Sequence, residues 1–220
     1  MSCDIEAVTA GGPVHRLARR PDAWAWPDWA YAGNDGTFGN RYDDPRGEFR
    51  VLYASTERVG AFLETLARFR PDPALVAALG EIEDGGGGDA LPPGSVPAEW
   101  LHDRAVGEAT LGGDYAQVGA SRSLAYLRSR LVVGDLDASA IRRRVPRSTT
   151  QAVGRVVFEC RAEDGGPQFA GVSYRSRLGD DIHNWAIFEP TEVAGSSEPL
   201  EEDDPDLALA LALLGLTLAG

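Results

Sequence analysis

NRYDDPRGEFRVLYASTERVGAFLE, residues 40–64, predicts a loop, a short strand and a helix in immediate succession. The loop is rich in turn residues and carries Arg41. Residues 51–54 form a short apolar run, as expected of a buried strand, and Ser55 is placed to cap a helix whose third turn carries Glu64. Arg41 and Glu64 therefore stand on different elements that fold close together.

Three side chains of this stretch have chemistry that suits a nucleotide. The guanidinium of Arg41 can pair with phosphate oxygens, and the ring of Tyr53 can pack against a planar base. The carboxylate of Glu64 can hold a ribose hydroxyl or stabilise a developing sugar cation. On a helical wheel Glu64 lies opposite the apolar stripe, beside the small residues of the helix. We therefore expect this face of the helix to approach another element or a ligand, rather than bulk solvent.

Composition excludes several other classes of protein. The 220 residues can form one domain with a sizeable core, and no apolar run is long enough to cross a bilayer. A net charge of −13 argues against direct nucleic-acid binding, which needs clustered cations. The sequence contains no lysine, which rules out Schiff-base catalysis and a phosphate-loop lysine. Cys3 and Cys160 fit a reducing cytosol, with Cys160 as a buried apolar residue, so a cytoplasmic location is expected.

The remaining pattern alternates strands and helices irregularly, without the rhythm of a doubly wound sheet. Scattered histidines offer no metal-site spacing, so no metal is expected. The tryptophans between residues 24 and 29 are expected to pack as a cover. Strands are predicted at 14–18, 106–111, 115–118, 168–174 and 184–188; helices are predicted at 72–82, from 121 to 131, and from a cap at Ser148 to Cys160.

A Leu/Ala run ends the sequence. Acidic residues and Pro205 precede it, as at a helix N-terminus, and the run is too short to span a membrane. We expect residues 205–220 to form a helix that packs on the body or on a second subunit, which leaves a homodimer open. Residues 191–204 then form an acidic linker, and residues 1–12 an N-terminal arm.

Residues 40–64, together with VHRL at 14–17 and SYRSRLG at 173–179, resemble the RES domain family, named for its Arg, Glu and Ser. The resemblance covers roughly residues 13–190. It implies an α+β fold similar to that of ADP-ribosyltransferases, with a small mixed or antiparallel split sheet flanked by helices. It also implies a toxin that destroys NAD by hydrolysis or phosphorolysis, with inorganic phosphate as co-substrate in the second case. A helix-turn-helix antitoxin is the implied partner.

The resemblance also implies roles for individual residues. Glu64, Arg41 and Ser176 are the implied catalytic residues, and the implied NAD contacts are Arg16, Arg41, Tyr42, Tyr53 and Ser176. Asp43 stands where the family usually has Asn, and a carboxylate there would weaken the binding of an anionic cofactor. Arg175 and Arg177 either bind phosphate or balance the aspartates that follow them. Two other activities stay open: transfer of ADP-ribose to a macromolecule, and nucleotide or partner binding without turnover.

Overall fold

An eight-stranded sheet runs through the computed structural model, which describes residues 2–72, 91–131, 136–142 and 146–219. Its strand order is β1-β6-β7-β8-β3-β2-β5-β9. Neighbouring strands are antiparallel except for β6 and β7, which are parallel. The strands are β1 (Ala7–Val8), β2 (Pro13–Arg19), β3 (Val51–Ser55), β5 (Arg104–Thr110), β6 (Tyr115–Gln117), β7 (Gly171–Arg175), β8 (His183–Phe188) and β9 (Ala194–Pro199). A separate parallel pair joins β4 (Ser95–Pro97) and β10 (Thr217–Ala219).

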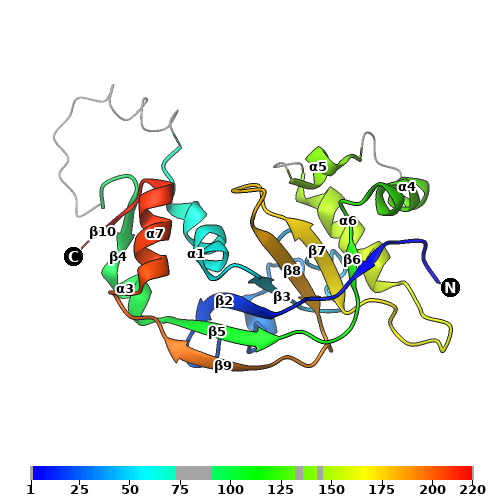
Figure 1. The fold of residues 1–220 in the computed structure, drawn as a ribbon, viewed down its shortest axis with the longest axis horizontal. Coiled ribbons are helices and arrows are strands. Elements are labelled where there is room, and N and C mark those ends of the chain that lie inside the picture. The colour runs from blue at the N-terminus through cyan, green and yellow to red at the C-terminus, as the bar shows by residue number, and fades with distance from the viewer. Residues whose placement is uncertain (1, 73–90, 132–135, 143–145, 220) are drawn as a thin grey trace.

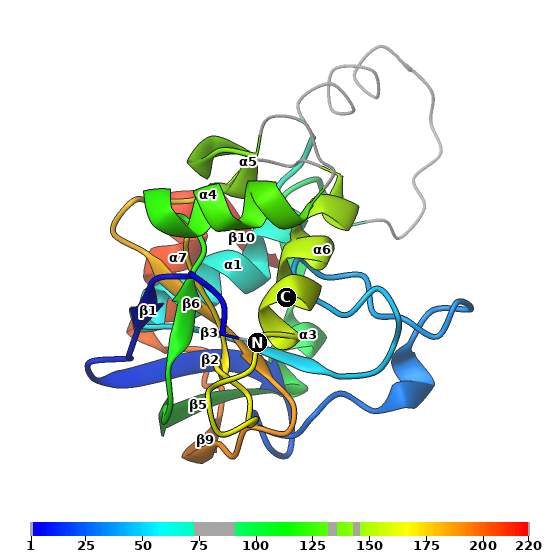
Figure 2. The same ribbon diagram turned by 90° about the vertical axis from the view of Figure 1, so that its right-hand side faces the viewer.

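The helices gather at two ends of the sheet (Figure 1). One group packs on β7 and β8 around buried residues that include Leu127, Val153 and Phe188. It comprises α4 (Ser121–Arg130), α5 (Ala138–Arg142) and α6 (Arg147–Phe158), as Figure 2 shows from the side. The other group packs around Phe62 and Leu207. It comprises α1 (Arg58–Leu66), which a 3-10 turn (Ala67–Phe69) extends, α3 (Ala98–His102) and α7 (Pro205–Leu214). The sheet between the two groups keeps an open face.

The predicted fold class is confirmed, since helices accompany a mixed, mostly antiparallel sheet without a closed barrel. The main sheet is larger than the small sheet expected. The two predicted serine caps are wrong. Ser55 stays in β3 because it pairs with Asn184 of β8, and α1 begins after Glu57 instead. Ser148 lies inside α6, which begins after Pro146. The predicted helix at 72–82 falls largely outside the described residues.

The two cysteines form a disulfide between Cys3 and Cys160, so the expectation of reduced thiols is wrong, whereas Cys160 is buried in the core as predicted. The bond joins the N-terminal segment to the residue that follows the end of α6, across 157 positions of sequence. Hydrogen bonds between Cys3 and Gln168 hold the same segment. Disulfides are rare in reducing compartments, so cysteine usage no longer supports a cytoplasmic location.

The segments outside the predicted catalytic domain contribute to the same architecture. β1 lies within residues 1–12 and pairs with β6, and β9 lies within residues 191–204 and pairs with β5. Asp204 caps α7, which packs against α1. Arg58 of α1 forms ion pairs with Asp204 and Asp206. Within the described ranges, no helix is long and apolar enough to cross a membrane.

The tryptophans between residues 24 and 29 differ in burial. Trp24 is buried and Trp26 is partly buried, both packing with residues of β2 and β5, so these two rings do cover that part of the sheet. Trp29 is 39% exposed, packs at a tilt against Phe38 and lies under the guanidinium of Arg50. None of the three lines the cavity described below.

Candidate active site

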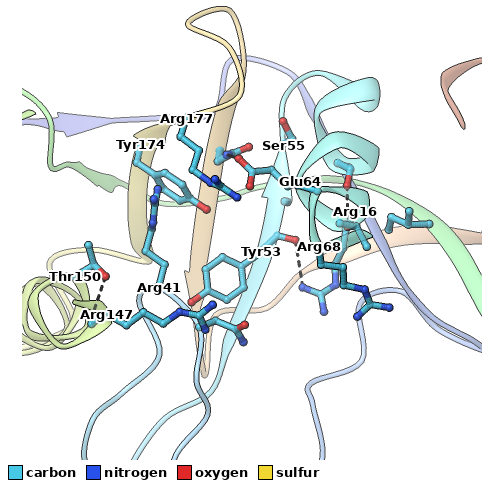
Figure 3. A pocket seen from close by; sticks show the side chains of 17 residues that line it. Arg16, Arg41, Tyr53, Ser55, Glu64, Arg68, Arg147, Thr150, Tyr174 and Arg177 are labelled. Carbon is cyan, nitrogen blue, oxygen red and sulfur yellow. Dashed lines mark hydrogen bonds between the residues drawn. The ribbon is translucent and has the colours of Figure 1, made fainter. Parts of the chain in front are cut away.

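A cavity of about 680 Å³ opens between α1 and α6, over β2, β3, β7 and β8. Its size lies within the range usual for sites that hold small molecules and cofactors. Figure 3 shows side chains from both helices and from the strands between them pointing into this space. The polar residues that line it are Arg16, Asn40, Arg41, Tyr53, Ser55, Glu64, Thr65, Arg68, Arg147, Thr150, Tyr174, Arg177 and Asn184.

Glu64 reaches the cavity because the helix that carries it lies close to the sheet. Gly60 permits this approach: a Cβ at that position would collide with the Oγ of Ser55. Ala61 and Ala67 are buried and line the cavity, as the small residues beside Glu64 led us to expect. Glu64 itself is exposed within this open space and lies in the second turn of α1, one turn earlier than predicted.

Two residues fix the carboxylate of Glu64 from the side of the sheet. Ser176 Oγ donates a hydrogen bond to Glu64 Oε1 at 2.5 Å, and Asn184 Nδ2 donates to the same oxygen at 2.8 Å. Ser176 Oγ also accepts a hydrogen bond from the backbone N–H of Leu178, at 2.9 Å, which leaves its own proton directed at the carboxylate. Among the described residues no donor contacts Oε2, so this oxygen is available to a ligand.

Five arginines line the cavity, each from a different segment: Arg16, Arg41, Arg68, Arg147 and Arg177. Arg16 donates through Nη1 to the carbonyl of Tyr53 at 3.2 Å, while its buried Nε has no acceptor in the described structure. Burial lowers the pKa of Arg16 to about 10. Arg41 donates to the carbonyl of Arg142 and lies 5.5 Å from the ring centroid of Tyr174. A positive cavity in a protein of charge −13 indicates an anionic ligand.

Tyr53, Tyr42 and Asp43 form a hydrogen-bonded chain below the cavity. Tyr53 Oη donates to Asp43 Oδ1 at 2.8 Å and accepts from the backbone N–H of Tyr42 at 2.9 Å. Tyr53 lines the cavity as predicted. Tyr42 does not line it: its side chain is fully buried against Tyr174, and its contact with NAD stays a prediction. The cause of this burial is Gly154 of α6, on which the backbone of Tyr42 packs closely.

Asp43 does not face the cavity either. It is 2% exposed, and its Oδ2 accepts the backbone N–H of Asn40 at 2.6 Å. Burial raises the pKa of this carboxyl group. The expected repulsion of an anionic ligand by Asp43 therefore loses its geometric basis, because this carboxylate serves to hold the loop of Arg41 and the ring of Tyr53.

The structure also decides between neighbouring arginines and adds residues that sequence reasoning missed. Arg177 lines the main cavity, whereas Arg175 lines a smaller one. Ser176 is 1% exposed and reaches the cavity only through Glu64. The most important residue missed is Asn184, an amide 2% exposed within the apolar strand β8. A single polar residue inside such a strand is the signal that could have identified it.

The described part of the chain holds no group of three or more histidine, cysteine or acidic side chains suited to a metal ion. No curated protein matches the sequence. A family model described as the RES domain matches residues 13–211, nearly the whole chain, including β9 and most of α7. The match extends past residue 190 because the sheet and the packing around α1 do so as well. The chain belongs to the RES domain family.

Proposed function

We propose that this protein cleaves the bond between nicotinamide and ribose in NAD, with water or inorganic phosphate as the acceptor. The observation that carries the proposal is Glu64: its Oε1 is held by two donors, its Oε2 is available, and arginines surround it in one cavity. Membership of the RES domain family supports an enzyme that acts on NAD. The choice of acceptor and the identity of the bond broken are part of the proposal.

The arginines supply the binding energy for the dinucleotide. A pyrophosphate carries two negative charges, and a guanidinium can pair with its oxygens through two parallel hydrogen bonds. Arg41 and Arg16 both line the cavity and lie on opposite sides of Tyr53, which supports the proposal that they grip the pyrophosphate (Figure 3). The ring of Tyr53 then offers a surface for nicotinamide or its ribose.

The reaction places its main demand on Glu64. When the bond between C1′ and the nicotinamide nitrogen breaks, its electron pair leaves with nicotinamide, which departs neutral and needs little acid assistance. The ribose is left with oxocarbenium character, which the Oε2 of Glu64 stabilises. Water or phosphate then forms the new bond to C1′, and an attacking water releases its extra proton to bulk solvent. Asn184 Oδ1 is buried without a donor in the described structure and can accept a ribose hydroxyl.

Ser176 takes a different part in this proposal from that implied by the resemblance. Its hydroxyl is buried and committed to Glu64, so it acts as a positioning residue that aims the carboxylate. Direct orientation of the ribose or the acceptor by Ser176 requires that this hydrogen bond be broken first. Asn184 shares the positioning task and, unlike Ser176, also lines the cavity.

The test is NAD loss catalysed by the purified protein, with and without inorganic phosphate, beside Glu64→Ala and Glu64→Gln. Removal of one preorganised charged group costs roughly two to three orders of magnitude in rate, so both variants should fall by about that factor. Glu159→Gln, a change to a partly exposed carboxylate at the end of α6, serves as the matched control. Full activity in Glu64→Ala would rule out the assignment. Dependence of the rate on phosphate would identify the acceptor.

Two other functions share the same site. Transfer of ADP-ribose to a macromolecule uses the same bond cleavage and requires that the target be present. A nucleotide-binding or partner-binding module would bind NAD without consuming it. For the cellular role we propose a toxin of a toxin–antitoxin pair, whose antitoxin carries a helix-turn-helix domain, because RES proteins typically occur in such systems. Co-purification with the product of a neighbouring gene, and loss of NAD cleavage on its addition, would test this role.

A further inference from the structure

Three arginines converge beside the cavity, at the end of β2 and β5. Arg19 of β2 and Arg104 of β5 are direct partners in the antiparallel register, and Arg68 extends from the 3-10 turn that follows α1. Like charges placed opposite each other on neighbouring strands destabilise a sheet. Trp100 of α3 lies under two of these groups, with its ring centroid 4.6 Å from Arg104 Cζ and 5.5 Å from Arg68 Cζ.

Arg104 is largely buried, and its Nε lacks a hydrogen-bond acceptor among the described residues. Only 9% of the residue is exposed. The Nε1 of neighbouring Trp100 is a second buried donor without an acceptor. Buried donors are nearly always satisfied in folded proteins, and a buried charge is normally paired. These two donors indicate a missing acceptor at this point.

The charges around Arg104 make the absence of an acceptor more costly. Within residues 2–72, 91–131, 136–142 and 146–219, neither Arg19 nor Arg68 nor Arg104 forms an ion pair. Burial lowers the pKa of Arg104, and the positive charges of Arg68 and Arg19 lower it further, whereas the carboxylate of Asp103 raises it. Burial lowers the pKa of Arg68, and the positive charge of Arg19 lowers it further. Stacking on Trp100 offsets part of this cost but supplies no acceptor for the N–H groups.

We propose that Arg19, Arg68 and Arg104 form a second oxyanion site, which binds a phosphate group outside the catalytic cavity. Arg19 and Arg68 are exposed and Arg104 lies beneath them, so the site is open to a ligand from solvent. Arginine suits phosphate because its planar group offers parallel N–H donors. Arg68 also lines the main cavity, which connects the two sites. The phosphate is either a free ion or a phosphate ester of a nucleotide that extends out of the cavity.

The first test is calorimetric titration with inorganic phosphate of the full chain, Arg19→Ala and Arg104→Met. Both variants should lose one bound phosphate per chain, or bind it at least about tenfold more weakly. Arg20→Ala, which changes an exposed arginine next to the site, should match the wild type, and so should Arg41→Ala for this second phosphate. Unchanged stoichiometry and affinity in both Arg19→Ala and Arg104→Met would overturn the proposal.

Thermal unfolding separates an anion site from a merely structural cluster. In phosphate-free buffer of low ionic strength, Arg19→Ala should unfold at a higher temperature than the wild type, because it removes a repulsive charge. In saturating phosphate the order should reverse, since only the wild type gains stability from the ligand. If the arginines serve only to stack on Tyr31 and Trp100, Arg19→Ala will be less stable in both buffers, and the proposal fails.

Kinetics identify the source of the phosphate. Arg104→Met should raise the KM for a dinucleotide with an extra phosphate on its adenosine ribose, relative to NAD, if the group belongs to the substrate. It should leave both KM values unchanged if the site takes a free ion. Either pattern supports the site, provided that the titration shows it. The titration itself does not depend on whether the protein cleaves NAD, so the two proposals can fail separately.

Discussion

Asn184→Ala is the most direct test of how Glu64 is held. The substitution removes the donor at 2.8 Å from Glu64 Oε1 and leaves Ser176 as the second donor. Hydrogen bonds to charged groups contribute about 1.5–3 kcal/mol. If the aim of the carboxylate matters chiefly in the transition state, kcat should fall roughly 10- to 150-fold, with a smaller change in KM.

Steady-state NAD cleavage measures this loss, with Asn34→Ala as the control because Asn34 is an exposed amide outside the cavity. Ser176 contacts the same oxygen of Glu64. The fall in kcat of the double variant Ser176→Ala/Asn184→Ala should therefore be smaller than the product of the falls in the two single variants. A kcat within about twofold of wild type in a folded Asn184→Ala protein would refute the reasoning. So would a loss confined to KM.

Asn184→Asp extends the test to pH. The introduced carboxylate lies beside Glu64, and neighbouring like charges raise the pKa of one member of the pair. The acidic limb of the kcat–pH profile should therefore move to higher pH than in the wild type. An unshifted limb would mean that the two groups do not interact, in contradiction to the geometry.

Three further predictions concern the arginines and the disulfide. Arg41→Ala should raise the KM for NAD by roughly 10-fold or more, with less effect on kcat, because a guanidinium that grips the pyrophosphate contributes in the ground state as well; an unchanged KM would place the pyrophosphate elsewhere. The pKa of Arg16 is lowered to about 10, so its charge in the ligand-free protein is present below that pH and lost above it. The KM for NAD, measured from about pH 8 to about pH 10.5, should therefore rise at the alkaline end. Arg16→Met should raise the KM at every pH and make its rise with pH smaller. The disulfide joins residues 157 positions apart, and on the chain-entropy model this stabilises the fold by about 5 kcal/mol. Denaturant unfolding of Cys3→Ser/Cys160→Ser should show most of this loss. Equal unfolding midpoints in the variant and the wild type would show that the disulfide does not restrict the unfolded chain in this way.

The sequence predicts the parts of the site that are local. Arg41, Tyr53 and Glu64 lie within 25 residues, and the loop, strand and helix that carry them follow from turn residues and apolar periodicity. The irregular alternation of elements argues against a doubly wound sheet, and the α+β fold class is what the resemblance to the RES domain family implies. Helical geometry alone also predicts that the face carrying Glu64 contacts something other than solvent, because small residues lie beside Glu64 on that face.

The remaining parts depend on pairings between distant segments. Ser176 and Asn184 lie 112 and 120 positions from Glu64. They meet it because β8, which carries Asn184, pairs with β3 in a particular register, and β7, which ends just before Ser176, pairs with β8. A shift of one residue in that register would turn Asn184 to the other face of the sheet. The bond between Cys3 and Cys160 has no sequence signature, because two cysteines without a motif spacing fit free thiols as well as a bridge.

The arginines of the cavity lie in a protein whose net charge is −13. The electrostatic potential is therefore positive close to these arginines, whereas the protein as a whole is negative. At physiological ionic strength charges are screened beyond about 8 Å, so a ligand inside the cavity is governed mainly by the arginines that line it. A polyanion too large to enter is repelled by the net negative charge of the protein. This distribution of charge favours a small anion over a nucleic-acid strand, which is consistent with the dinucleotide that we propose as substrate.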